Sequence, residues 1–265
     1  AKDVVYSVTR LMSLNEGPAY LFEGVLDANS VTALDTSTVQ FKLNKTYTPF
    51  LTNTPIMFVV NSDIAEANKT ADDPWAQDFL ANNTAGAGAY MLDSWARGAT
   101  MTIKKFDGYH LGWNSQSLDE VRFIITNEEA TVKALAASGV LSMSSDSQAQ
   151  ETYDSIGAMD GYRVISYPTA TNFYFKLNHQ VAPTDDVHIR KAIAMATDYD
   201  TIRGALLPGE PLAGPMPNIF ADAYLNTLTL PSFDLNAARE HVAASKYAGG
   251  GVIPVEIMYV AGLAF

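Results

Sequence analysis

Residues 171–217, TNFYFKLNHQVAPTDDVHIRKAIAMATDYDTIRGALLPGEPLAGPMP, carry the densest structural pattern in the chain. The alternating apolar side chains of residues 173–177 predict a buried strand. The acidic pair Asp185-Asp186 then precedes the periodic segment HIRKAIAMATD, which predicts a helix with an acidic cap. A second short helix and a crossing rich in glycine and proline complete the stretch. The order strand, turn, helix, helix is typical of an α/β protein.

The same periodicities extend the α/β pattern over the rest of the chain. Gly98 lies between two alternating runs, which predicts a hairpin. Asn127, Asp234 and Gly139 are expected at helix ends, the first two as N-caps and the glycine as a terminator. Strands are predicted at 38–43, 56–60, 89–96, 100–106, 121–125, 162–167 and 253–265, and helices over 3–11, 130–139 and 234–249.

Composition excludes several classes of function. The chain has 265 residues and a formal net charge of −12, from 17 basic and 29 acidic groups. Because a protein that neutralises phosphates needs a basic face, this charge excludes a nucleic-acid partner. The chain has no cysteine, which removes disulfides, thiol nucleophiles and cysteine-bound zinc. We expect no cofactor and no metal.

Short motifs in order along the chain resemble a known family. Leu177-Asn178, Ile189-Arg190-Lys191-Ala192 and Ala196-Thr197-Asp198 are similar to the middle of the family 5 periplasmic solute-binding proteins of ABC importers, the peptide-binding type. The resemblance extends over nearly the whole chain. It includes DVVYSVTR at 3–10, DTSTVQF at 35–41, GAGAY at 86–90, LDEV at 118–121 and NEEA at 127–130.

The resemblance implies a fold and a division into lobes. The fold is a periplasmic-binding-protein-like α/β fold of type II, peptide-binding class, with mixed sheets and flanking helices, and it is incomplete. Residues 1–82 would form part of a small lobe, 83–210 the central lobe, and 211–265 the start of a further lobe. The helical pattern at the first residues and the apolar last residues both suggest an internal piece of a longer chain.

The resemblance also implies a function. A peptide or similar small solute would lie between two lobes, held by main-chain hydrogen bonds like an added strand, and a membrane permease would receive it. The protein would be a periplasmic, or extracellular and membrane-anchored, monomer and not an enzyme. By position, the ligand-binding residues present here would be Tyr20, Asn172, Phe173, Tyr174, Gly214 and Met216. A role for Phe173 in the core is equally open.

Other kinds of site compete with this interpretation. A hydrolase is the main alternative, but Gly-x-Ser-x-Gly is absent and the acidic pair is better explained as a cap.

Of the four histidines, no two lie three or four residues apart, as helical metal ligands often do. His110 or His179 would be the contact in a nickel-binding relative, a minor alternative, while His188 and His241 are expected on exposed helix faces. Arg190 is expected in an ion pair that ties its helix to a neighbour. A sensor that borrowed the binding fold is a third class.

Overall fold

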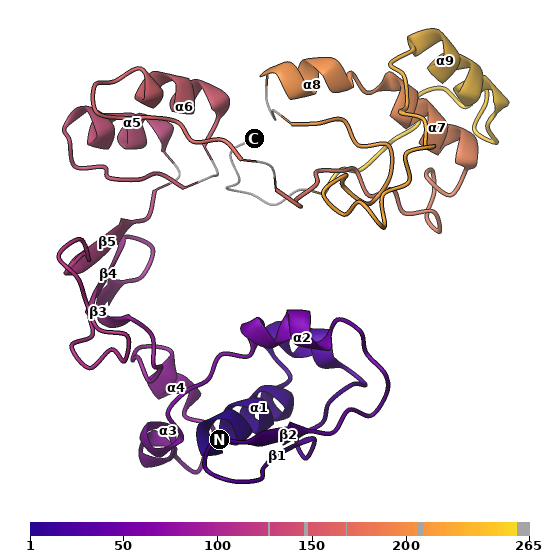
Figure 1. Cartoon of the computed structure of the whole chain (residues 1–265). Helices are drawn as coiled ribbons and strands as arrows, with labels where there is room; N and C mark the ends of the chain where they lie inside the picture. Colours follow the sequence, from indigo (N-terminus) through magenta and orange to yellow (C-terminus); the bar gives the residue numbers. More distant parts are fainter. Residues whose placement is uncertain (127, 146–147, 168, 206–208, 259–265) are drawn as a thin grey trace. The chain divides into compact units, whose positions relative to one another are not determined.

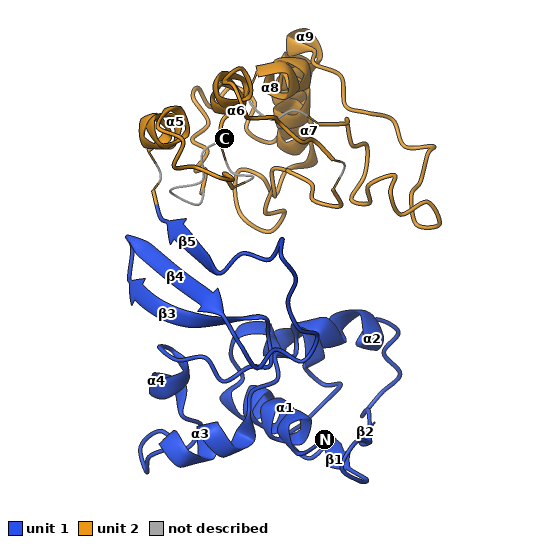
Figure 2. Ribbon diagram, turned by 60° about the vertical axis from the view of Figure 1, so that its left-hand side comes forward, with its two compact units in different colours: residues 1–125 blue, residues 126–265 orange. Residues whose placement is uncertain are grey.

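The computed structural model describes residues 1–126, 128–145, 148–167, 169–205 and 209–258. The chain separates into two compact units, residues 1–125 and residues 126–265 (Figure 2). In the described part of the chain, no helix combines the length and the apolar character that crossing a membrane requires.

The first unit contains short helices and two small antiparallel sheets, and α1 lies against β1 of the smaller sheet (Figure 1). The sheets have the strand orders β1-β2 and β3-β4-β5. The elements are α1 (Lys2–Leu14), the 3-10 helix η1 (Gly17–Phe22), β1 (Val31–Ala33), β2 (Val39–Phe41), α2 (Phe50–Asn53), the 3-10 helix η2 (Thr54–Ile56), α3 (Ser62–Asn68), α4 (Gln77–Leu80), β3 (Tyr90–Ala96), β4 (Thr100–Lys105) and β5 (Glu120–Ile124).

The apolar face of α1 forms one side of the first unit's core. Val8 on α1 is buried, and Phe22 of η1 is completely buried beside it. The predicted apolar face of this helix is confirmed, because Val4, Val5 and Leu11 pack against the same cluster. The other buried members are Val25, Leu26, Val31 and Met57.

Hydrogen bonds join α1 to the segment that begins α3. The Asp3 carboxylate accepts from the backbone N–H of Ser62 at 2.8 Å and from its hydroxyl at 2.6 Å. These two donors hold the pKa of Asp3 below its usual range, because they stabilise the charged form. The Ser7 hydroxyl accepts from the backbone N–H of Val60 at 2.9 Å. Residues about 55 positions apart are thereby fixed to one another.

The predicted hairpin is confirmed as the start of a three-stranded antiparallel meander. β3 pairs with β4 and β4 with β5, with a register shift between Leu92 and Ser94. Gly98 has a φ of 74° in the connecting turn, a conformation that only glycine adopts without strain. The predicted strand at 121–125 is β5, and the predicted strand at 38–43 contains β2.

The second unit is helical in its regular elements. These are α5 (Glu129–Ala137), α6 (Gln150–Gly157), α7 (Val187–Ala196), α8 (Tyr199–Ala205) and α9 (Leu235–Ala244). α5 and α6 bury Val132, Ala136 and Ile156 between them. Gly139, with a φ of 71°, follows the end of α5 as predicted. The predicted cap Asn127 lies outside the described residues.

Helices α7 and α9 lie side by side and are antiparallel (Figure 1). The backbone N–H of Asp234, before α9, donates to the carbonyl of Met195 near the end of α7 at 2.8 Å. At the opposite end, the N–H of Lys246 donates to the Asp186 carboxylate at 2.9 Å. Both predicted caps are confirmed: Asp186 accepts from the N–H of His188, and Asp234 accepts from those of the first residues of α9.

Several predicted strands are wrong. Residues 56–60, 162–167, 173–177 and the described part of 253–265 belong to no strand. Alternation indicates that a segment favours extended backbone, but a strand exists only where a second one supplies the hydrogen-bonded ladder. In the described residues, all paired strands belong to the two antiparallel sheets.

The expected ion pair of Arg190 is also wrong. Its guanidinium donates to the carbonyl oxygens of Thr184 and Asp185, at 2.8 and 3.1 Å, within its own turn. Backbone carbonyl oxygens are acceptors for guanidinium N–H groups, and here they lie where the chain folds back on the start of the helix. The lobe boundaries expected at residues 82 and 210 concern a complete binding protein and stay a prediction.

Candidate functional site

Two of the three segments that carry the expected ligand-binding residues lie together in the second unit. The side-chain Nδ2 of Asn172 donates to the carbonyl oxygen of Pro215 at 3.0 Å. This bond joins residues 172–174 to residues 214–216, although 43 positions separate its two ends. We call these two ranges the tethered segments. Five of the six expected residues therefore share one part of the second unit.

Large apolar side chains of the tethered segments face solvent. Tyr174 is 72% exposed, Phe173 58% and Met216 36%. Of the two roles left open for Phe173, burial in a core is therefore excluded in this chain. Because water contact with apolar surface costs roughly 25 cal/mol per Å², such a surface is stabilised when a ligand or another surface covers it.

Gly214 occupies a position where any added side chain would contact a neighbouring residue. A Cβ built there would lie 2.5 Å from Cδ1 of Leu228. The contact is with the end of a flexible side chain, so a small substitution would displace Leu228 and leave the backbone in place. The glycine allows Leu228 to lie against the second tethered segment.

Tyr20 belongs to the first unit. It lies on η1 between Ala19, which is buried, and Phe22, which is completely buried. These neighbours anchor the 3-10 turn to the core, whereas the Tyr20 ring is 71% exposed. The turn thus presents an aromatic ring on a fixed backbone.

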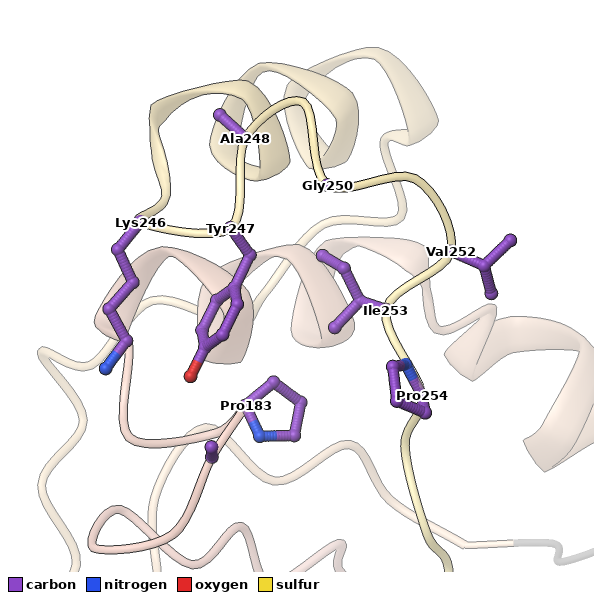
Figure 3. Close-up of a pocket in the computed structure, with 9 residues that line it drawn as sticks. Pro183, Lys246, Tyr247, Ala248, Gly250, Val252, Ile253 and Pro254 are labelled. Carbon is purple, nitrogen blue, oxygen red and sulfur yellow. The ribbon is translucent and has the colours of Figure 1, made fainter.

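A hollow of about 400 Å³ lies elsewhere in the second unit, beside the loop that follows α9 (Figure 3). The ring of Tyr247 points toward Pro183, and Ile253 and Pro254 close the opposite side (Figure 3). The Tyr247 hydroxyl donates to the Asp185 carboxylate at 2.9 Å. Desolvation and this carboxylate raise the pKa of the tyrosine. None of the six expected residues lines this hollow.

Trp113 and Tyr109 belong to an aromatic cluster with a structural role. Trp113 packs against Tyr90 and Tyr109 with ring centroids 5.3 and 5.4 Å apart. Its indole N–H donates to the carbonyl of Phe106 at 3.0 Å, and the Lys105 ammonium lies 4.9 Å from its ring centroid. These contacts stabilise the loop between β4 and β5.

Sequence reasoning missed a histidine pair. Nδ1 of His188 on α7 lies 3.1 Å from Nδ1 of His241 on α9, and both rings are half-buried. The prediction of exposed faces for these two histidines is wrong, because both are half-buried. Spacing along one helix carries no signal for this pair, because 53 residues separate its members and tertiary packing brings them together.

Comparison with known protein families finds a match over nearly the whole chain. The sequence profile described as "Bacterial extracellular solute-binding proteins, family 5 Middle" matches residues 1–262. The chain belongs to this family. The family consists of binding proteins and not of enzymes, which agrees with the expectation of no catalytic role.

A curated relative supports the assignment. The Probable D,D-dipeptide-binding periplasmic protein DdpA of Escherichia coli K12 is 29% identical over 221 residues, which cover 82% of this chain and 41% of that protein. The family 5 chain described here thus spans about two fifths of this relative's length.

Solved structures show the same fold. DppA of Helicobacter pylori, in complex with the peptide STSA, matches with a TM-score of 0.71 at 21% identity, over 92% of this chain and 49% of that one. MoaA of A. tumefaciens R10, in complex with mannopinic acid, matches with a TM-score of 0.73 at 17% identity, over 93% and 48%. The periplasmic-binding-protein-like α/β fold expected for the chain is confirmed, with partial coverage of the full fold.

Proposed function

We propose that this chain forms part of a two-lobed clamp that captures a peptide-like solute outside the cytoplasmic membrane and passes it to an ABC permease. Membership in family 5 over residues 1–262 is the observation that carries the proposal. The part of the protein that encloses the other side of the ligand would lie in the portion of the relatives' length that this chain does not span.

The tethered segments supply what the capture of a peptide needs. Residues 172–174 belong to no strand in the described part of the chain, and we propose that the ligand lies along them. An added strand gains affinity from main-chain hydrogen bonds, and neighbouring side chains select its residues. Tyr174 and Met216 would cover apolar parts of the ligand. Asn172 would hold the backbone in place through its bond to Pro215.

The ligands of the relatives favour a peptide. The name of the Escherichia coli relative refers to D,D-dipeptides, and the Helicobacter pylori structure contains a four-residue peptide. The structure with mannopinic acid gives a reason to include non-peptide solutes in any test. The ligands named for these relatives are all small polar molecules, and we propose that a cleft encloses such a molecule here.

Delivery to a permease requires two states of the clamp. A ligand that contacts both lobes binds the closed state more tightly, so it shifts the population toward closure. Hinge motion between lobes is the usual form of such closure. The family description places these proteins outside the cell, and we propose a periplasmic, or extracellular and membrane-anchored, location for this one, with a monomeric state.

The proposal is tested by identifying the natural ligand. The complete protein that contains this chain would be purified under native conditions and its bound small molecules released and sequenced by mass spectrometry. We expect short peptides in a ratio near one per protein. A non-peptide solute would correct the ligand class and keep the binding function. Absence of any bound molecule, together with failure of peptides and small acids to bind the emptied protein, would overturn the proposal.

A matched pair of variants tests the tethered segments. Tyr174→Ala removes a ring that is 72% exposed within the first segment, and Tyr167→Ala removes a ring that is 67% exposed outside it. If the ring covers the ligand, the first variant weakens binding and the second leaves it unchanged. Equal effects would show that Tyr174 is not part of the site.

A further inference from the structure

The contact between His188 and His241 has the geometry of a chelating pair. The Nδ1 atoms lie 3.1 Å apart, and the ring centroids lie 5.3 Å apart with the planes tilted by 41°. In the neutral pair, one Nδ1–H donates to the lone pair of the other Nδ1. If each ring instead holds its proton on Nε2, both Nδ1 atoms carry a lone pair and lie 3.1 Å apart.

The spacing suits a divalent metal ion. Two zinc–nitrogen bonds of about 2.0–2.1 Å at a tetrahedral angle place the two nitrogens about 3.3–3.4 Å apart. The same bonds at the right angle of a square-planar site place them about 2.8–3.0 Å apart. The observed 3.1 Å lies between these values. An ion could enter with side-chain adjustments of a few tenths of an ångström.

The helices that carry the pair are fixed to one another at both ends. The bond from Asp234 to Met195 and the bond from Lys246 to Asp186 hold α7 and α9 antiparallel. Ile189 and Ala192 on α7 and Ala238 on α9 are buried. Ligands on a rigid scaffold lose little conformational freedom on binding, which favours chelation.

The surroundings determine which ion fits and how tightly. In the described residues, no group of three or more histidine, aspartate and glutamate side chains is placed to hold a metal, so water would complete the coordination. Imidazole ligands favour Cu²⁺, Ni²⁺ and Zn²⁺ over Mg²⁺ and Ca²⁺. The Asp186 carboxylate accepts the backbone N–H of His188 at 2.7 Å and adds negative charge nearby. A two-ligand site of this kind exchanges its ion readily.

We propose that His188 and His241 form a two-histidine clamp for a late first-row divalent cation, with water as the remaining ligands. The clamp joins α7 to α9 directly, so a bound ion strengthens the contact between the two helices. This site is independent of the tethered segments and of the proposed solute.

Titration with Zn²⁺ tests the clamp. The tag-free 265-residue chain, freed of metal with a chelator, would be titrated by calorimetry at neutral pH, beside the variants His188→Gln and His241→Gln. We expect one ion per chain and, in either variant, a loss of affinity at least as large as the roughly 10–100-fold that loss of an outer-shell partner causes. His179→Gln is the matched control, because His179 is exposed and lies outside the pair, and its affinity should equal that of the unaltered chain.

A second measurement does not depend on the variants' folding. In the unaltered chain, Zn²⁺ should shift the nuclear magnetic resonance signals of the His188 and His241 rings together, with both rings adopting the Nε2–H form. Cu²⁺ should show two equivalent nitrogen couplings by electron paramagnetic resonance. Unchanged Zn²⁺ affinity in both variants, or ring signals that do not respond to Zn²⁺, would overturn the proposal and leave the pair as a hydrogen bond between helices.

Discussion

Nδ2 of Asn172 donates a hydrogen bond of 3.0 Å to the carbonyl oxygen of Pro215. The bond joins two segments that are 43 positions apart along the chain. Tyr174 and Met216, both exposed, lie on these two segments. The side-chain amide of Asn172 thus contributes to holding the candidate ligand surface together.

Replacing Asn172 by alanine should loosen the second tethered segment. A single hydrogen bond of this type contributes about 0.5–1.5 kcal/mol, which corresponds to about twofold to tenfold more opening by local unfolding. The initial rate of thermolysin cleavage within residues 209–217 should rise by that factor. Asn218→Ala is the control, because Asn218 is exposed and makes no side-chain hydrogen bond among the described residues. Equal rates in the two variants would contradict the tether.

The contact between α5 and α6 should depend on pH through Glu129. Its carboxylate accepts from the Thr152 hydroxyl at 2.6 Å and from the backbone N–H of Ala149 at 3.3 Å. The hydroxyl chiefly holds the pKa of Glu129 below its usual value. A carboxylate whose pKa is lower in the folded state than in the unfolded state stabilises the fold. The stabilisation is fully present at pH values above the pKa of the unfolded state, near 4.5. It is lost as the pH falls through the lower pKa of the folded state.

Urea unfolding at pH 7, 5, 4 and 3 would measure this dependence. Glu129→Gln should be less stable than the unaltered chain at pH 7, and the difference should shrink toward pH 3. Glu128→Gln, which removes an exposed carboxylate one residue earlier, is the control measured under the same conditions. A constant difference for Glu129→Gln would show that its ionisation does not support the contact.

The core of the first unit should depend strongly on Phe22. The ring is completely buried and lies 6.5 Å, centroid to centroid, from that of Phe50. Phe22→Ala should lower the free energy of unfolding by about 3–5 kcal/mol, because it leaves a cavity. Phe58 is 78% exposed, and Phe58→Ala should change the stability by less than about 0.5 kcal/mol. The free energy of unfolding would be measured by urea unfolding. Comparable losses in both variants would contradict the assignment of Phe22 to the core.

Helix α9 should depend on its cap. Asp234 accepts from the backbone N–H groups of Asn236 and Ala237, both at 2.9 Å. Asp234→Ala should cost about 0.5–2 kcal/mol in urea unfolding, whereas Asp234→Ser, which keeps a capping oxygen, should retain most of the stability. If serine destabilised as much as alanine, the carboxylate would act through its charge and not as a cap.

Local patterns along the chain predicted the elements that local interactions determine. Capping oxygens gave the starts of α7 and α9, the apolar face gave α1, and Gly98 marked the turn between β3 and β4. Each of these signals lies within a few residues of the feature it predicts.

Features that depend on distant residues were not predicted. The alternating residues 173–177 indicated a buried strand, but in the described part of the chain they belong to no strand, and Phe173 and Phe175 are exposed. Likewise, nothing in the spacing of His188 and His241 indicates that their rings meet. Partners 40 or more positions away decide both outcomes. Of the six expected site residues, tertiary structure brings five together, through the tether to Pro215.

Calorimetry combined with product analysis tests the central claim most directly. The complete protein, emptied of ligand, would be titrated with short peptides, and the peptides would then be recovered and weighed by mass spectrometry. If the chain is part of a passive clamp, one peptide binds per protein and returns with its mass unchanged. Cleaved or modified peptides after incubation would contradict the account.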